Sequence, residues 1–226
     1  MVEGVSDRTS LGYILSKIIN NHKVQFRIIG TDITSDKYTT QKNAIEKVTG
    51  QINTFLDESK YRQSDIERIV HIVDTDGTYI PETSITQDTS ITKWVYDEEC
   101  IISNNIEATK KRNNNKVAVL NKLSTTPMLF RKKVPYKVFY FSCNLEHVLH
   151  DIRNAEDEKK DILAEEFVES FRGHEHDFLN FIGASDFTVT GEYKETWEFI
   201  KQGTNSLKRY SNFHLCFNEE SEKHEE

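Results

Sequence analysis

Three short apolar runs, separated by longer segments with helical spacing, constrain the fold of this 226-residue chain more than any other feature. The runs are residues 24–29 (VQFRII), 68–73 (RIVHIV) and 136–141 (YKVFYF). They are rich in β-branched and aromatic residues, so they predict strands that are buried on both faces. Met1 and Val2 add the stub of a further strand at the start of the sequence.

The segments between these runs predict helices. Residues 7–21 and 40–58 each carry their apolar side chains on one stripe, as amphipathic helices do. A third helix is expected over residues 104–124, where the asparagines at 113–115 favour an interruption that divides it. The resulting order, β-α-β-α-β-α-β, predicts an α/β fold in which right-handed crossovers join parallel strands.

After residue 143 the pattern changes and predicts helices only. Four are expected, at residues 144–152, 155–172, 174–182 and 192–202. We therefore expect three parts in the chain: an α/β domain over residues 1–143, a helical extension packed on it over 144–218, and a solvated acidic tail over 219–226.

Composition excludes several classes of protein. No run approaches the roughly 18 apolar residues that a membrane span needs, and the opening MVEGVSDRTS lacks the features of a signal peptide. We therefore expect a cytoplasmic protein with no membrane association. The three cysteines, Cys100, Cys143 and Cys216, form no CxxC pair, so neither a disulfide framework nor a thiolate zinc site is indicated.

The net charge of −8 argues against strong nonspecific binding of nucleic acid by the surface as a whole. Basic residues nevertheless gather within residues 110–133 and again within 206–212. A local basic surface could meet phosphate there, although a solvated helix face is the plainer explanation of such a run. The candidate nucleic-acid contacts are Lys110, Lys111, Arg112, Arg131, Lys132, Lys133, Lys208 and Arg209.

Acidic residues fall where strands are expected to end. Glu3 follows the first stub, and Asp74 and Asp76 follow the run at 68–73. Because ligands bind beyond the carboxyl ends of strands in an open α/β sheet, these carboxylates are expected to converge. Oxygen ligands without His or Cys suit Mg²⁺ or Mn²⁺, ions that support phosphoryl transfer. Residues i and i+2 of an extended segment share a side, so Asp74 and Asp76 are expected to face one ion.

Two of these segments resemble the motifs of toprim domains. VEGVSD at residues 2–7 resembles the opening motif, hydrophobic-E-G-x-S/T-D/E, and IVHIVDTDG resembles the strand that ends in D-x-D. The resemblance implies a Rossmann-like parallel sheet with a metal-dependent centre that cleaves or joins strands. It implies that Glu3 is an acid/base or metal ligand, that Asp74 and Asp76 are metal ligands, and, as in OLD-like nucleases, that Asp7 joins the metal site.

The segment SCNLEHVLH at residues 142–150 resembles the S-N-P-x-F-E-x-W-x-x-x-H segment of RloB-like proteins, with the proline and tryptophan absent. These small toprim proteins are associated with abortive infection and phage defence. The resemblance implies that Glu146 assists catalysis, that His150 contacts a phosphate or a proton, and that the protein is an endonuclease acting on DNA or RNA. A partner such as an ATPase or sensor is expected, because the chain has no G-x-x-x-x-G-K-[ST] loop. Homo-oligomerisation is left open.

Two other functions stay open at this point. VDTDGT also fits the hydrophobic-D-x-D-G-T motif of haloacid-dehalogenase-type phosphatases, with Asp74 as nucleophile and Asp76 as acid/base, although no downstream lysine with paired aspartates completes the set. A noncatalytic interaction module is the second alternative. The plainer interpretations are a helix N-cap for Asp7, a solvated or salt-bridged residue for Glu146, and a packed core histidine for His71.

Overall fold

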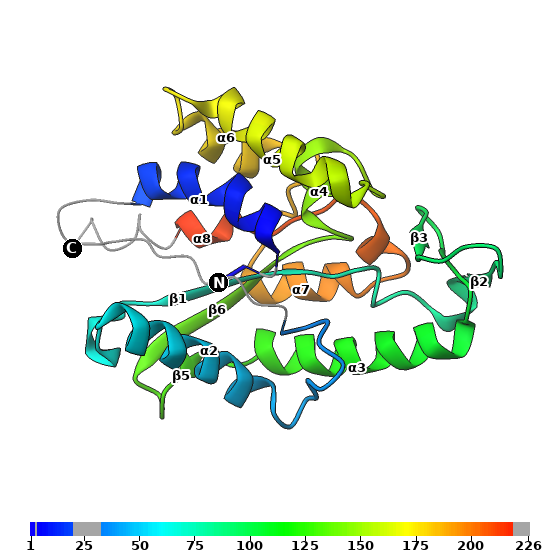
Figure 1. Cartoon of the computed structure of the whole chain (residues 1–226), viewed down its shortest axis with the longest axis horizontal. Coiled ribbons are helices and arrows are strands. Elements are labelled where there is room, and N and C mark those ends of the chain that lie inside the picture. The colour runs from blue at the N-terminus through cyan, green and yellow to red at the C-terminus, as the bar shows by residue number, and fades with distance from the viewer. Residues whose placement is uncertain (3, 20–32, 219–226) are drawn as a thin grey trace.

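A computed structural model describes residues 1–2, 4–19 and 33–218 of the chain, and of Val5, Ser6 and Asp7 it describes the backbone alone (Figure 1). The strand expected at 24–29 and the tail expected at 219–226 lie outside these residues. Within the described residues the chain is an α/β protein with eight α-helices and two small sheets of three strands each.

The larger sheet has the strand order β1-β6-β5 and contains the two described apolar runs that predicted strands. β1 and β6 are parallel, with Asp74 opposite Phe141 at their carboxyl ends. β5 is antiparallel to β6, so the sheet is mixed, whereas the sequence predicted parallel strands only. The strands are β1 (Ile69–Asp74), β5 (Met128–Leu129) and β6 (Val134–Phe141).

The chain adds short pairings at both sides of this sheet. The Met1 nitrogen donates to Val70 O (2.5 Å) and Ile72 N donates to Met1 O (2.9 Å), which is the pattern of parallel pairing with β1. The predicted stub at Met1 and Val2 is therefore confirmed. On the far side of β6, Phe141 forms an antiparallel bridge with Ser211. The part after residue 143 thus contributes sheet pairing as well as helices.

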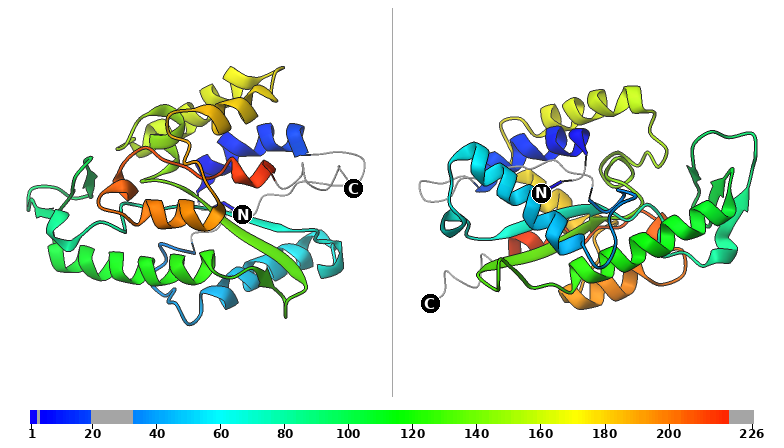
Figure 2. Two further views of the ribbon diagram at one scale, coloured as in Figure 1. Left: turned by 180° about the vertical axis from the view of Figure 1, so that it is seen from behind. Right: turned by 60° about the horizontal axis from the view of Figure 1, so that its bottom comes forward.

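Helices cover both faces of the sheet (Figures 1 and 2). Two buried clusters fill the two interfaces, and β6 contributes to them in alternation, with Tyr136, Val138 and Tyr140 in one and Phe139 and Phe141 in the other. The first face is covered by α2 (Ala44–Ser59), α3 (Ile106–Ser124) and α7 (Tyr193–Ile200). The second is covered by α1 (Val5–Ile19), α4 (Leu145–His150), α5 (Asp157–Phe171), α6 (Asp177–Ala184) and α8 (Leu215–Asn218).

Every predicted helix has a counterpart within a few residues, but the predicted break at 113–115 is wrong, because α3 continues through it. Asparagine disfavours helix interiors by competing for backbone hydrogen bonds. Here the side chains bond elsewhere: Asn113 Oδ1 accepts from Arg112 (2.7 Å), and Asn115 Nδ2 donates to Thr39 O (2.8 Å). The tertiary hydrogen bond of Asn115 therefore offsets part of the weak local propensity.

A smaller sheet, which the sequence did not predict, lies on the connection between β1 and α3. Its strand order is β2-β4-β3, with β2 (Ile85–Gln87), β3 (Val95–Tyr96) and β4 (Ile101–Ser103). Three short 3₁₀ turns complete the described elements, at Gln63–Asp65, Glu82–Ser84 and Asn205–Leu207. Of the helices that the structure describes, none has the length and apolarity needed to cross a membrane.

Candidate active site

The carboxyl ends of β1 and β6 lie side by side because the two strands are parallel and in register up to Asp74 and Phe141. Ligands of open α/β sheets bind beyond such strand ends. We use the name carboxyl edge for the last residue of β1 and nearby residues that come after the two strands, namely Asp74, Asp76, Cys143 and Glu146; the arrows of β1 and β6 point toward this edge in Figure 1. Glu3 lies outside the described residues, and so does the side chain of Asp7.

Thr75 joins the two strand ends. Its amide donates to Phe141 O (3.1 Å), and its buried hydroxyl accepts from Cys143 N (3.0 Å) while donating to Ser206 O (3.0 Å). The next amide, of Asp76, donates to Cys143 O (2.7 Å). The backbone at the carboxyl edge is therefore held from three segments that are far apart in the sequence.

Asp76 departs from the two-residue alternation that holds up to Asp74. Val70 and Ile72 pack against the cluster shared with α1 and α4, and the two-residue alternation of β1 places Asp74 on that same face. β1 ends at Asp74, and Asp76 adopts a positive φ of 47°, so the alternation stops there. The contacts of Asp76 are instead with α3. The expectation that both carboxylates face one ion assumed an extended chain through Asp76, and the backbone does not have that conformation.

Asp76 is the centre of a buried ion-pair network. Its Oδ2 lies 2.5 Å from Lys116 Nζ and 3.0 Å from Arg112 Nη2, and Ser35 Oγ donates to the same oxygen (3.4 Å). The Lys116 side chain is only 1% exposed. Arg112 also donates to the backbone oxygen of Asp76 (3.0 Å) and lies 4.5 Å from the ring centre of Trp94. Sequence reasoning missed this role of Lys116, because its position on a helix did not indicate a partner at the end of β1.

Burial and the charges of this network together set the protonation of Asp76 and Cys143. Burial alone would raise the pKa of the Asp76 carboxyl, but Lys116 and Arg112 outweigh it and hold the pKa below its ordinary value. Burial raises the pKa of the Cys143 thiol well above its ordinary value, and the negative charges of Asp76 and Asp74 raise it further. Asp76 is therefore ionised at neutral pH and the thiol of Cys143 is neutral, which disfavours Cys143 as a nucleophile.

Glu146 lies in the first turn of α4, which Asn144 caps by accepting from His147 N (2.8 Å). The Glu146 side chain is buried, and Lys160 Nζ is 3.8 Å from its Oε1. Burial lowers the pKa of His147 to about 4 and also lowers that of His150, whose ring packs on Phe167 at 5.5 Å. Both histidines are therefore neutral at pH 7.

The donor set fits a hard divalent cation in part. Asp74 and Glu146 offer carboxylate oxygens of the kind that Mg²⁺ or Mn²⁺ prefers. Asp76 does not fit, since its described contacts already join Oδ2 to two cationic side chains. Among the described residues, no three His, Cys, Asp or Glu side chains lie together as a metal-binding group. A complete ligand set would need Glu3 or Asp7, whose side chains the structure does not describe.

The candidate basic residues do not form one surface. Near the carboxyl edge, Lys110 pairs with Glu82 and Glu107, and Lys208 pairs with Glu99. Arg209 donates to Val148 O, and Lys111 is exposed on α3.

The other three candidates, Arg131, Lys132 and Lys133, occupy the exposed turn between β5 and β6, at the amino end of β6. At about 3.3 Å per strand residue, this turn is roughly 25 Å from the carboxyl edge. These residues therefore cannot contact a phosphate that is bound beside Asp74.

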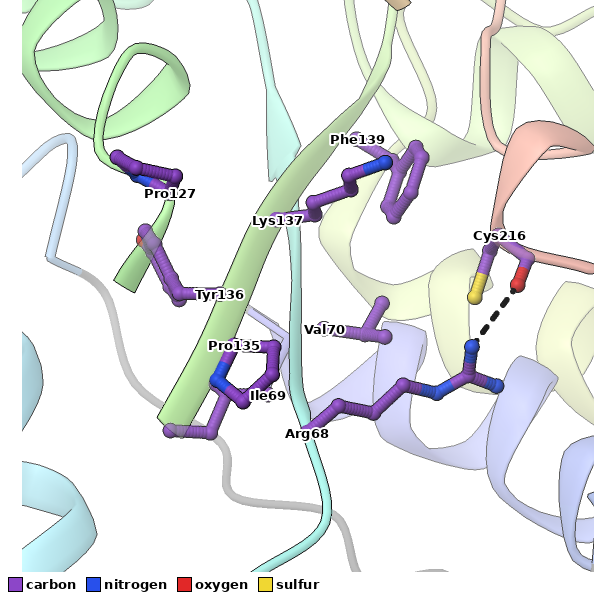
Figure 3. A pocket seen from close by; sticks show the side chains of 9 residues that line it. All are labelled: Arg68, Ile69, Val70, Pro127, Pro135, Tyr136, Lys137, Phe139 and Cys216. Atoms are coloured by element: carbon purple, nitrogen blue, oxygen red, sulfur yellow. Dashed lines mark hydrogen bonds between the residues drawn. The ribbon is translucent and has the colours of Figure 1, made fainter. Parts of the chain in front are cut away.

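A small cavity also lies away from the carboxyl edge, over the amino-terminal halves of β1 and β6 (Figure 3). Arg68 and Lys137 contribute charge to it, and Arg68 Nη1 donates to Cys216 O (3.5 Å). Tyr136 lines it from β6, and its hydroxyl bonds His71 Nδ1 (2.8 Å) within the core. His71 is fully buried, as predicted, and the cavity has no connection to the acidic residues.

Comparisons with known proteins identify no relative: no family model, no curated protein and no solved structure matches the chain.

Proposed function

We propose that this chain is a metal-dependent nuclease that hydrolyses phosphodiester bonds in DNA or RNA on a toprim-type sheet. The observation that carries the proposal is the parallel pairing of β1 with Met1 on one side and with β6 on the other. In the sequence, Asp74 is the last residue of β1, and Glu3 and Glu146 lie in the segments that follow Met1–Val2 and β6. Acidic residues after neighbouring parallel strands are the arrangement expected of a divalent cation site.

The chain's own residues would hold the site and keep it rigid. Asp74 and Glu146 supply carboxylates for the ion, with Glu3 and Asp7 as further candidates. A divalent ion bound there would neutralise charge on the reacting phosphate and lower the pKa of a water molecule. Thr75 and Asn144 fix the backbone on which Asp74 and Glu146 stand, which limits the reorganisation needed when substrate binds.

The biological setting is proposed from resemblance. VEGVSD at residues 2–7 is similar to toprim sequences, and residues 142–150 are similar to those of RloB-like proteins of phage defence. These similarities support a role in antiphage defence. A separate ATPase or sensor subunit would supply the nucleotide-binding motif that the sequence lacks.

Cleavage assays on plasmid DNA, single-stranded DNA and total RNA with Mg²⁺ or Mn²⁺ test the proposal. Asp74→Asn should lower the cleavage rate on the order of 100-fold or more, because several kcal/mol of charge stabilisation depends on the ion. Asp57→Asn is the matched control, since Asp57 is an exposed aspartate near the end of α2. Cleavage by Asp74→Asn at the wild-type rate would exclude the assignment.

A phosphatase is the second candidate, and one contact favours it. Lys116 Nζ lies 2.5 Å from Asp76 Oδ2, so a lysine downstream of VDTDGT does reach that motif. In this alternative Asp74 is the nucleophile and Asp76 the acid/base. The low pKa of Asp76 counts against it, because an acid/base group works best with a pKa near the operating pH. Phosphate release from nucleotides without cleavage of polynucleotides would favour the phosphatase.

A further inference from the structure

The second aspartate of the D-x-D segment has contacts that conflict with metal binding. Asp76 Oδ2 is shared by the Lys116 ammonium at 2.5 Å and the Arg112 guanidinium at 3.0 Å. Two cations around one carboxylate leave this group with a formal charge of +1. A divalent ion on the same carboxylate would lie beside the Lys116 ammonium, and like charges at such distances in a buried site repel strongly.

Lys116 is not positioned to swing away from Asp76. Its side chain is 1% exposed, and its Nζ also donates to Ser35 Oγ (3.0 Å). The next turns of α3 are anchored in the core by Val119, Leu120 and Leu123, all fully buried. The ammonium is therefore a fixed part of the folded chain.

Asp76 is equally constrained. Its backbone amide donates to Cys143 O (2.7 Å), and its backbone oxygen accepts from Arg112 Nη1 (3.0 Å). Its positive φ of 47° ends the extended conformation of β1, and its carboxylate contacts Lys116 and Arg112 of α3. Moving Asp76 onto an ion beside Asp74 would require the network and the turn to change together.

We infer that Asp76 is a positioning residue and not a metal ligand, and that the Lys116 ammonium takes the place of a second divalent ion. The inference rests on the proposed function and makes it more specific: the site takes one divalent ion, held through Asp74. Asp76 fixes Lys116 and Arg112 of α3 at the end of β1, so a permanent positive charge borders the place where the phosphate reacts.

Mn²⁺ binding to the full chain without substrate tests the inference, with calorimetry or electron paramagnetic resonance giving stoichiometry and Kd. Wild type should bind one Mn²⁺. Asp76→Asn should keep that stoichiometry with a Kd within about twofold, and Asp74→Asn should raise the Kd at least about tenfold, as loss of a ligand does. Asp76→Asn should nevertheless lose most of its kcat, a split that a purely structural defect would not produce.

Asp76→Asn leaves the buried Lys116 without its countercharge, so a double variant guards against a folding defect. Asp76→Asn/Lys116→Met removes both charges and should recover part of the Tm that Asp76→Asn loses. It should still bind one Mn²⁺ but remain slow in cleavage, because the fixed ammonium is gone.

The outcomes separate the inference from the function. Two bound ions in the wild type would overturn the inference without contradicting the proposed nuclease function. So would an equal loss of Mn²⁺ affinity in Asp76→Asn and Asp74→Asn. Absence of Mn²⁺ binding and of cleavage in the wild type would overturn both.

Discussion

The Thr75 hydroxyl accepts a hydrogen bond from Cys143 N at 3.0 Å and donates one to Ser206 O at 3.0 Å, so one side chain joins the ends of two parallel strands to a turn near residue 206. Thr75 is fully buried, so a water molecule could not replace its hydroxyl beside Cys143 N and Ser206 O without rearrangement. The hydroxyl therefore matters more to this edge than the methyl group does.

Thr75→Val should destabilise the fold by about 1–3 kcal/mol, because two buried hydrogen bonds of the hydroxyl are lost while Cys143 N still donates to Ser206 O (3.0 Å). Thr75→Ser keeps the hydroxyl and should cost about 1 kcal/mol, the value of one buried methyl group. Urea unfolding of the two variants beside wild type measures the difference. A cost for Thr75→Val no greater than that for Thr75→Ser would show that these two hydrogen bonds do not stabilise the edge.

Gly77 follows Asp76 at this edge, and both its backbone conformation and its surroundings disfavour any side chain at this position. Its φ is +63°, and a Cβ there would lie 2.3 Å from Leu207 Cδ2. Gly77→Ala should therefore lower stability by roughly 2–4 kcal/mol, combining the cost of a positive φ with that of overpacking. Gly203→Ala is a matched control, since Gly203 has a φ of +53° and no atom within 4 Å of its would-be Cβ. Equal losses of Tm in both variants would exclude a contribution from the Leu207 clash.

The sequence predicted the parts of the fold whose signals are local and repeated. The runs at 68–73 and 136–141 became β1 and β6, and the apolar stripe over 40–58 became α2, because each buries a continuous face. The small sheet was missed since β2, β3 and β4 have only two or three residues each, too few for a periodic pattern to show.

The candidate site was predictable in composition but not in detail. The position of Asp74 could be predicted from its place at a strand end, where the alternation of β1 still holds. The orientation of Asp76 could not be predicted, because it depends on a single backbone angle. An aspartate before glycine fits either an extended segment or a left-handed turn. The contact with Lys116 joins residues 40 apart in sequence and depends on how α3 packs, which no local pattern encodes.

The basic turn between β5 and β6 offers a test of substrate length. Arg131, Lys132 and Lys133 are exposed there, roughly 25 Å from the carboxyl edge at about 3.3 Å per strand residue. At 3.4 Å per base pair, a duplex must extend about seven base pairs from the cleavage point to reach them. Replacing all three by alanine should leave cleavage of shorter duplexes unchanged and weaken binding of long ones at low salt. An equal loss of binding and cleavage on short and long duplexes would contradict this geometry.

His71 gives the fold a pH dependence whose sign follows from burial. Burial, reinforced by the positive chain terminus, lowers the pKa of His71 to about 3, compared with an ordinary value of 6.5. Between these two values the unfolded chain binds a proton at His71 that the folded chain does not. The contribution of the neutral His71 to the free energy of unfolding is therefore fully present above pH 6.5 and is lost as the pH falls through this window. The free energy of unfolding should fall by up to about 1.4 kcal/mol per pH unit from this group.

Urea unfolding at pH 7.5 and 5.0 measures this effect, and a variant isolates the contribution of His71. The His71 Nδ1 bonds Tyr136 Oη at 2.8 Å, so His71→Phe is best made together with Tyr136→Phe, which avoids leaving a buried hydroxyl unpaired. From pH 7.5 to pH 5.0, the free energy of unfolding should fall by about 2 kcal/mol less in the double variant than in wild type, because the variant lacks the buried neutral imidazole. Because the ordinary carboxylates contribute equally to both proteins, an identical pH dependence would mean that His71 is protonated in the folded state.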